Sequence, residues 1–180
     1  MVKLGVRVLR VPEEDYETYP FYRFQSLPPL LFSLLLSYSA AAIGGLASVN
    51  AENFYALLVR PTWAPPAWLF GPVWSILYTL IAASIWLVWL KARFGVRLPY
   101  LVLGAQLVFN TLWSWLFFYW QLGFLAVLEI TLLWVLIVIN IVSFFRISKT
   151  ASLLLLPYLC WVSFAAILAT DLWLNNPSHL

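Results

Sequence analysis

The chain has 180 residues, of which 64% are apolar and only 9% are charged. A soluble domain is roughly half apolar and about a quarter charged, so this composition excludes an ordinary water-exposed protein. The net charge of +3 is not gathered into a basic patch and accompanies no nucleic-acid-binding motif, so we expect no nucleic-acid partner.

Five long apolar stretches follow one another, and each has about the 20 residues that a transmembrane helix needs. They predict an all-α fold, an integral membrane bundle of five transmembrane helices in one domain. The expected spans cover residues 28–49, 69–90, 99–120, 123–145 and 151–174. Pro28 and Pro29 fit the first turn of the first span, because amides there need no intrahelical acceptor.

The segments outside these spans are short, apart from residues 1–27. That N-terminal segment carries an acidic run, Glu13 to Glu17, and lacks an apolar core and a cleavage site, so it does not resemble a signal peptide. We expect an exposed, mostly irregular tail with room for a short strand at residues 4–8, and a second short tail at residues 177–180. In the loop over residues 50–68, Pro61, Pro65 and Pro66 exclude a continuous helix.

Basic residues divide unequally between the two sides of the predicted bundle. Nine Lys and Arg residues lie on one side and only Arg60 lies on the other. By the positive-inside rule, the N-terminus is cytoplasmic, and the C-terminus and the Pro-rich loop are outside. We expect a multi-pass protein in the lipid bilayer of a prokaryotic cell membrane, with an organelle membrane of a eukaryote as the alternative.

Residues that support metal or covalent chemistry are scarce. Cys160 is the only cysteine and His179 the only histidine, which excludes an intramolecular disulfide and argues against a metal site. No Ser-His-Asp set, paired carboxylates or Gly-rich phosphate loop is present. We therefore expect no cofactor, no metal and no conventional catalytic site.

One stripe of the third span combines two amides with aromatic rings. Gln106, Asn110, Trp113 and Phe117 are spaced i, i+4, i+7 and i+11, which places them on one helix face. Amides are costly in lipid, so this face should point into the bundle. Interhelical hydrogen bonds and polar contacts inside a ligand cavity both explain the pattern.

Two further spans carry similar stripes: Phe70, Trp74 and Tyr78 on the second, and Trp161, Ala165 and Leu168 on the fifth. Most of the other tryptophans lie near span ends, as expected of an interfacial belt. A cavity walled by indoles and two amides would suit a flat, aromatic ligand with a few polar edges.

Two features of the predicted spans each allow two explanations. The pairs Ala40 with Gly44 and Ala41 with Gly45 allow close helix approach, either within the bundle or across a homodimer seam. Glu129 lies inside the fourth span, where a carboxylate is either a functional group or a hydrogen-bonded structural one.

Three segments together resemble the tryptophan-rich sensory protein family, whose animal members are called translocator proteins or peripheral benzodiazepine receptors. The first reads FYALLVRPTWAPP at residues 54–66 and continues as FGPVW at residues 70–74. The second holds the Gln106, Asn110 and Trp113 stripe. The third runs from Pro157 to Trp173.

The resemblance implies a bundle, often dimeric, whose cavity beneath the first loop binds tetrapyrroles and synthetic aromatic ligands. Carried over by position, it implies ligand contacts at Tyr55, Trp63, Pro65, Pro66, Phe70, Trp74, Tyr78, Gln106, Asn110, Trp113, Phe117, Trp161, Ala165 and Leu168. Thr170 and Leu174 stand where the animal cholesterol pattern has Tyr and Arg. With no histidine to ligate haem iron, a metal-free porphyrin of the protoporphyrin type is the expected ligand.

The functional expectation is a membrane receptor or regulator of porphyrin-like tetrapyrroles, coupled to transport or stress signalling. One alternative is light-dependent porphyrin breakdown, an enzymatic role in which Trp74 and Trp161 would act as photo-oxidisable indoles. Another is a small-molecule carrier or membrane scaffold.

Overall fold

The computed structural model describes residues 20–92 and 97–180 of the chain. These residues fold into α1 (Pro20–Ala47), α2 (Ala51–Leu57), the 3-10 helix η1 (Ala67–Leu69), α3 (Phe70–Lys91), α4 (Arg97–Ser114), the π-helix η2 (Trp115–Tyr119), α5 (Gly123–Phe145), α6 (Lys149–Leu153) and α7 (Leu156–Asn175). No strand occurs in the described ranges, and the strand expected at residues 4–8 lies outside them.

Five helical segments are long and apolar enough to cross a membrane: Leu27–Ala47, Ala67–Lys91, Arg97–Tyr119, Gly123–Phe145 and Lys149–Asn175. A helix suits a lipid environment because it bonds its own backbone amides and carbonyls, which have no water partner there. The predicted all-α bundle with five spanning helices is therefore confirmed.

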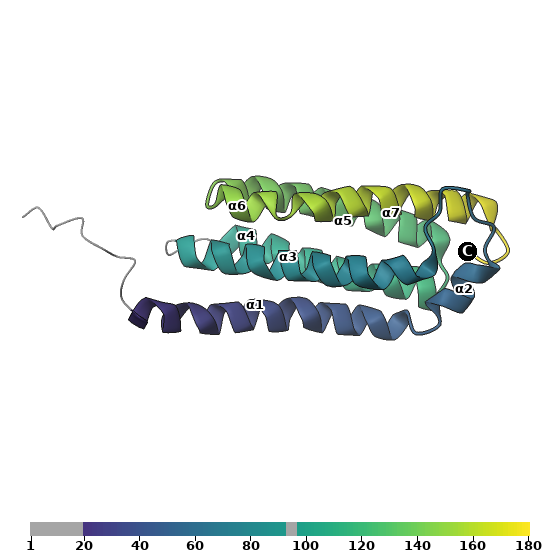
Figure 1. The fold of residues 1–180 in the computed structure, drawn as a ribbon. Helices are drawn as coiled ribbons and strands as arrows, with labels where there is room; N and C mark the ends of the chain where they lie inside the picture. Colours follow the sequence, from purple (N-terminus) through teal and green to yellow (C-terminus); the bar gives the residue numbers. More distant parts are fainter. Residues whose placement is uncertain (1–19, 93–96) are drawn as a thin grey trace, which may run out of the picture.

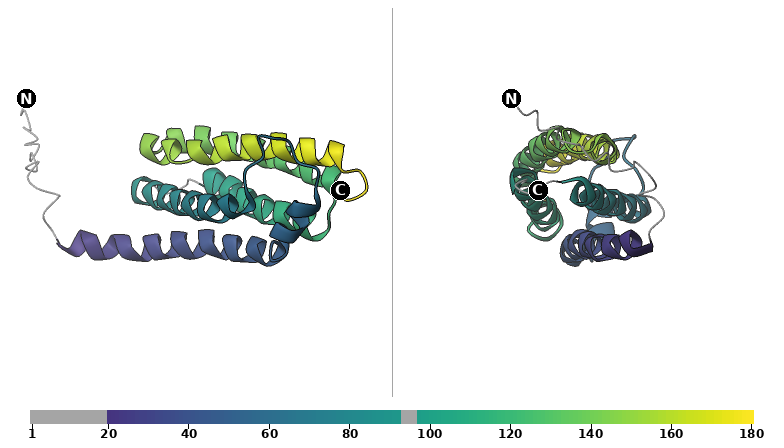
Figure 2. Two further views of the ribbon diagram at one scale, coloured as in Figure 1. Left: turned by 45° about the vertical axis from the view of Figure 1, so that its right-hand side comes forward. Right: turned by 90° about the vertical axis from the view of Figure 1, so that its left-hand side faces the viewer.

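The bundle is arranged about a central pair of helices. Figures 1 and 2 show α3 and α4 in the middle, with α1 on one side and α5, α6 and α7 on the other. In agreement, α1 packs on α3 and α4, while α5 packs on α4 and α7. The segment between α2 and η1 crosses the end of the bundle at which α7 ends (Figure 1). We call this segment, residues 58–66, the cross-over loop.

Helix α1 starts earlier than the sequence predicted. It begins at Pro20, within the expected tail, so Pro28 and Pro29 lie inside the helix instead of in its first turn. Pro20 itself now occupies the first position, where a missing amide hydrogen costs no bond. Prolines within a spanning helix are tolerated where neighbouring groups satisfy the freed carbonyls.

Two other spans are interrupted. The expected third span, residues 99–120, changes from α-helix to π-helix after Ser114. The expected fifth span, residues 151–174, is divided into α6 and α7, because Pro157 occupies the first turn of α7 and cannot continue a preceding helix. The fourth span runs from Gly123 to Phe145, the bounds expected from the sequence.

The turn between η2 and α5 is very tight. Gln121 adopts a φ of 55°, in the left-handed region, and Gly123 follows in a crowded position. A Cβ atom added to Gly123 would lie 2.6 Å from Trp173 Cδ1 and 2.8 Å from Leu180 Cβ. Only glycine therefore lets α7 and the segment after it close over this turn.

Small residues of α1 let it approach α4 closely. A Cβ on Gly44 would lie 3.3 Å from Ser114 Oγ, and the Thr111 hydroxyl donates to the Ala40 carbonyl at 3.2 Å. The pair Ala40 and Gly44 thus serves packing within the bundle. The expected homodimer stays a prediction that draws no support from this pair.

Candidate functional site

A cavity of about 620 Å³ lies between α1, α3 and α4, beneath α2. Binding cavities for small molecules typically measure about 300–1,000 Å³. Its lining comprises Tyr38, Ala41, Ala42, Gly44, Gly45, Ser48, Val49, Ala51, Glu52, Tyr55, Ala67, Phe70, Gly71, Trp74, Ser75, Tyr78, Asn110, Trp113, Ser114 and Phe118. We call this space the main cavity.

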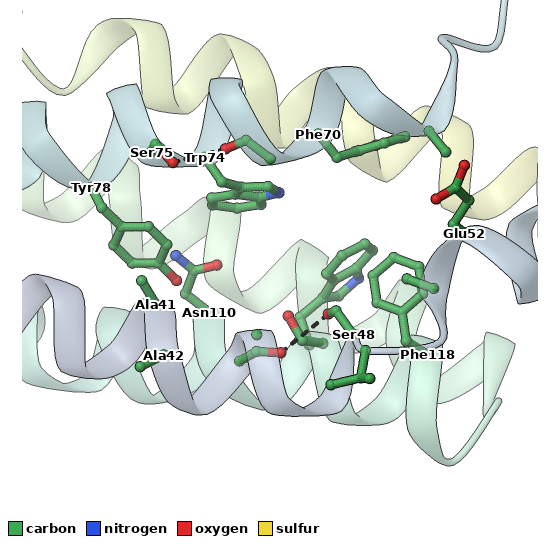
Figure 3. A pocket seen from close by; sticks show the side chains of 18 of the residues that line it. Ala41, Ala42, Ser48, Glu52, Phe70, Trp74, Ser75, Tyr78, Asn110 and Phe118 are labelled. Carbon is green, nitrogen blue, oxygen red and sulfur yellow. Dashed lines mark hydrogen bonds between the residues drawn. The ribbon is translucent and has the colours of Figure 1, made fainter.

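Helix α3 supplies an aromatic wall. Phe70, Trp74 and Tyr78 recur every fourth residue, so all three rings face the same side (Figure 3). The Trp74 and Tyr78 ring centroids are 5.7 Å apart, and the Tyr55 ring meets Phe70 edge-on at 5.6 Å. At 1.5 Å per residue, this wall extends about 12 Å along α3.

Helix α1 supplies the opposite wall from small side chains, which the sequence analysis did not assign to a site. Ala41, Ala42, Gly45 and Ser48 leave the space that larger residues would fill. The sequence signal for this wall is the second pair of small residues, Ala41 and Gly45. Each of them follows a member of the pair Ala40 and Gly44 by one residue, so the second pair lies on a neighbouring face of α1. Tyr38 bounds this wall at its inner end, where its hydroxyl pairs with Thr79 Oγ1 at 2.8 Å.

Helix α4 contributes two buried hydrogen-bond donors. Asn110 and Trp113 line the main cavity and are 2% and 7% exposed. Neither Asn110 Nδ2 nor Trp113 Nε1 has a partner among the described residues. Buried donors are costly to leave unpaired, so these two nitrogens are available to acceptor atoms of a ligand.

Gln106, one turn below Asn110, has a different environment. Its side chain is fully buried, and its Oε1 accepts a hydrogen bond from Asn140 Nδ2 of α5 at 3.0 Å. Gln106 is not part of the cavity lining. The structural explanation, an interhelical hydrogen bond, therefore applies to Gln106, whereas the cavity explanation applies to Asn110.

Phe117 also lies away from the main cavity, for a reason visible in the backbone. The π-helix places the Trp120 amide on the Trp115 carbonyl at 2.8 Å, five residues back. Because a π-helical turn holds more residues than an α-helical one, the residue that follows Trp113 on the same helix face is Phe118 (i+5) instead of Phe117 (i+4). As a result Phe118 lines the cavity, while Phe117 stacks on Trp113 at 5.2 Å and meets Phe54 at 6.2 Å.

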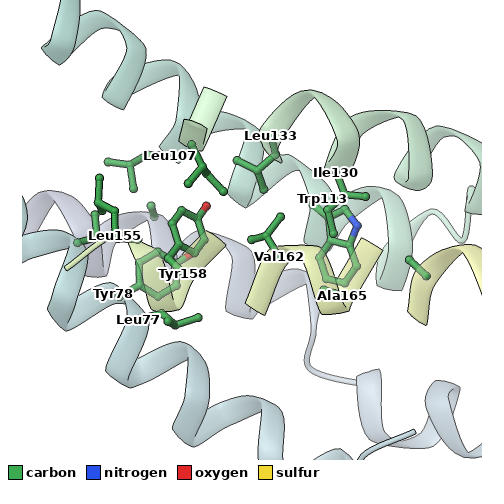
Figure 4. Packing of buried hydrophobic residues seen from close by; sticks show 14 of the residues in the cluster. Leu77, Tyr78, Leu107, Trp113, Ile130, Leu133, Leu155, Tyr158, Val162 and Ala165 are labelled. Carbon is green, nitrogen blue, oxygen red and sulfur yellow. The ribbon is translucent and has the colours of Figure 1, made fainter. Parts of the chain in front are cut away.

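The predicted residues of the fifth span lie behind the α3 wall or in the core. Trp161 meets Phe70 edge-on at 5.8 Å and contacts Phe164 at 5.4 Å, and Trp63 packs on Phe164 in turn. Ala165 belongs to the buried core near Trp113 and Ile130 (Figure 4), and Leu168 is also buried there. Four predicted site residues therefore lie outside the cavity lining, and their contact with a ligand stays a prediction: Trp63, Trp161, Ala165 and Leu168.

The cross-over loop is fixed at both ends. The Tyr55 hydroxyl donates to the Pro65 carbonyl at 3.0 Å, and burial raises the pKa of Tyr55, which keeps this donor protonated. Asn176, 3% exposed after the end of α7, accepts from the Val59 amide at 2.7 Å and donates to the Val59 carbonyl at 3.0 Å. Sequence reasoning missed Asn176, since a single Asn after a helix carries no special signal.

Glu129 of α5 is buried, 5% exposed, yet neither carboxylate oxygen has a partner in the described part of the chain. The hydrogen-bonded structural role therefore receives no support from its contacts. Glu129 is absent from the cavity lining as well.

The fold and cavity define a class: a multi-pass helical membrane protein with a cavity of small-molecule size between its helices. Residues 32–174 match the TspO/MBR family, and the chain belongs to that family. The Tryptophan-rich protein TspO of Chlorobaculum tepidum is 42% identical over 131 residues, covering 71% of this chain and 82% of the relative. The Tryptophan-rich protein TspO of Archaeoglobus fulgidus is 37% identical, with the same coverage. The human Translocator protein is 33% identical over 147 residues, 78% of this chain and 86% of the relative.

Proposed function

We propose that this protein is a membrane receptor or regulator that binds flat, porphyrin-like tetrapyrroles in the main cavity. The observation that carries the proposal is the pair of buried, unpartnered donors, Asn110 Nδ2 and Trp113 Nε1, opposite an aromatic wall. Ring faces of Phe70 and Trp74 favour a flat π-system, and the two N–H groups favour acceptor atoms at its edge. His179, the one histidine, lies outside the cavity lining, so a metal-free macrocycle is the better match.

The experiment is a titration of the purified protein with protoporphyrin, following tryptophan fluorescence. Saturable quenching is expected. The double variant Trp74→Ala with Asn110→Ala removes one ring face and one donor and should weaken binding at least about tenfold. Trp89→Ala is the matched control, because this exposed tryptophan lies at the far end of α3, outside the cavity lining, beside the rings of Phe32 and Tyr100. Absence of saturation, or equal affinities for the double variant and the native protein, would overturn the proposal.

We propose further that the end carrying α2 and Arg60 faces outward, because the basic residues concentrate at the opposite end. Single cysteines placed at exposed positions Thr62 and Thr150, in a Cys160→Ser background, test this. An impermeant maleimide added to intact cells should label position 62 and not position 150. The reverse pattern would invert the proposed topology.

A further inference from the structure

A second hollow, of about 470 Å³, lies in the cross-over loop. It is lined by Leu58, Arg60, Pro61, Ala64, Pro65 and Pro66. Of these residues Arg60 alone carries a charge, and its side chain is exposed. We call this space the loop hollow.

Tyr55 connects the loop hollow with the main cavity. Its ring lines the main cavity, its hydroxyl bonds to the Pro65 carbonyl at 3.0 Å, and the Arg60 guanidinium lies 4.8 Å from its ring centroid. Tyr55 therefore lines the main cavity and contacts two residues that line the loop hollow, Arg60 and Pro65. An arm extending from a ligand in the main cavity past the edge of Tyr55 would reach Arg60.

Arg60 has no carboxylate partner. No ion pair involving Arg60 occurs among residues 27–92 and 97–180, whose side chains the structure describes. The other Lys and Arg side chains in those ranges, Lys91, Arg97, Arg146 and Lys149, all belong to the opposite end of the bundle. The Arg60 guanidinium lies 4.8 Å from the Tyr55 ring centroid and also interacts with the Tyr55 hydroxyl. Because a guanidinium has five N–H donors, this contact leaves donors for a further acceptor.

Among the described residues, two acids lie at this end of the bundle, Glu52 of α2 and Asp171 of α7, and Asp171 lines neither space. Glu52 of α2 lines the main cavity (Figure 3), whereas Arg60 lines the loop hollow. A negatively charged group would be repelled by Glu52 and attracted by Arg60. The charges thus favour one placement, with the apolar body inside the main cavity and the anionic group in the loop hollow.

We propose that Arg60 in the loop hollow binds a carboxylate on a short flexible arm of the ligand whose flat body occupies the main cavity. This inference rests on the proposed function and specifies it: the ligand is an acidic tetrapyrrole carrying carboxyalkyl groups. The planar guanidinium presents paired N–H donors that match a carboxylate. Tyr55 then acts as a positioning residue, holding the guanidinium beside the route between the two spaces.

The test compares protoporphyrin, which carries two carboxylates, with its dimethyl ester, which carries none but has the same macrocycle. Both are titrated against the native protein and Arg60→Gln in the same detergent. For the acid, Arg60→Gln should weaken binding about tenfold. For the ester, the affinities of the two proteins should agree within about twofold.

Two further variants separate charge from structure. Lys149→Gln removes a basic residue at the opposite end and should leave both affinities unchanged. Arg60→Lys keeps the charge but loses the paired donors, so its affinity for the acid should fall between those of Arg60→Gln and the native protein.

Equal losses for acid and ester in Arg60→Gln would overturn this inference while leaving the proposed function standing, since they would mean that Arg60 only supports the loop. The same holds if Arg60→Gln binds the acid as well as the native protein does. If neither compound saturates the native protein, the proposed function itself fails, and this inference with it.

Discussion

The two sides of the central pair α3 and α4 differ in how they meet their neighbours. On the α5 and α7 side, Ile130, Leu133 and Val162 fill the space (Figure 4). Gln106 Oε1 accepts there from Asn140 Nδ2, while Gln106 Nε2 has no partner among the described residues. On the α1 side, alanines and glycines leave a cavity, and Asn110 keeps an unpaired donor. The same helix, α4, serves both sides. Whether its amides act in packing or face a cavity thus depends on the residues opposite them.

Filling the cavity should have the largest effect. Gly45 of α1 lines the main cavity and has no atom within 4 Å of an added Cβ. Gly45→Phe should therefore fold normally and lower porphyrin affinity about 100-fold, equivalent to about 2.7 kcal/mol. Gly104→Phe is the control, since Gly104 is equally open and lies outside the cavity. Equal affinities for the two variants in fluorescence titrations would show that the cavity is not the binding site.

Exchanging each amide of α4 for leucine should distinguish the two sides directly. Asn110→Leu removes a free donor, so porphyrin affinity should fall about tenfold with little change in thermal stability. Gln106→Leu leaves Asn140 unpaired, so the free energy of unfolding should fall by about 1–3 kcal/mol with affinity preserved. Titrations and thermal melts of both variants provide the measurement, and identical effects would contradict the contrast between the two sides.

Releasing the cross-over loop should alter kinetics more than affinity. Asn176→Ala removes both hydrogen bonds to Val59, so the ligand should dissociate about three to ten times faster in stopped-flow measurements. Asn175→Ala is the control, because Asn175 bonds only to Asp171 within its own turn. An unchanged dissociation rate in Asn176→Ala would mean that the loop does not limit ligand exit.

The smallest effect is expected at the inner end of the cavity. Tyr38→Phe removes the hydroxyl contact with Thr79, one of the polar links between α1 and α3. Interhelical hydrogen bonds in membranes contribute about 0.6 kcal/mol on average, so stability should fall by roughly that amount. A double-mutant cycle with Thr79→Val measures the coupling. Additive effects would show that the two side chains do not hold α1 in place.

The sequence predicted the spans well because a membrane helix must be apolar throughout, and composition alone reveals this. The bounds of α5 were predicted to the residue, whereas the fifth span was predicted as one stretch over residues 151–174, and its division at Pro157 was missed. The aromatic wall of α3 followed from its spacing. Phe118 could not be predicted, since the π-helix shifts the spacing and no residue pattern marks it. The α1 wall was missed because small residues indicate close packing and an empty space equally well.

The tight turn at Gln121 and Gly123 bears on how the chain assembles during synthesis. Only residues 120–122 connect η2 to α5. The groups that pack on Gly123, Trp173 and Leu180, are made only after α7. The contacts that cover this turn therefore cannot form before α7 and the residues after it have been synthesised.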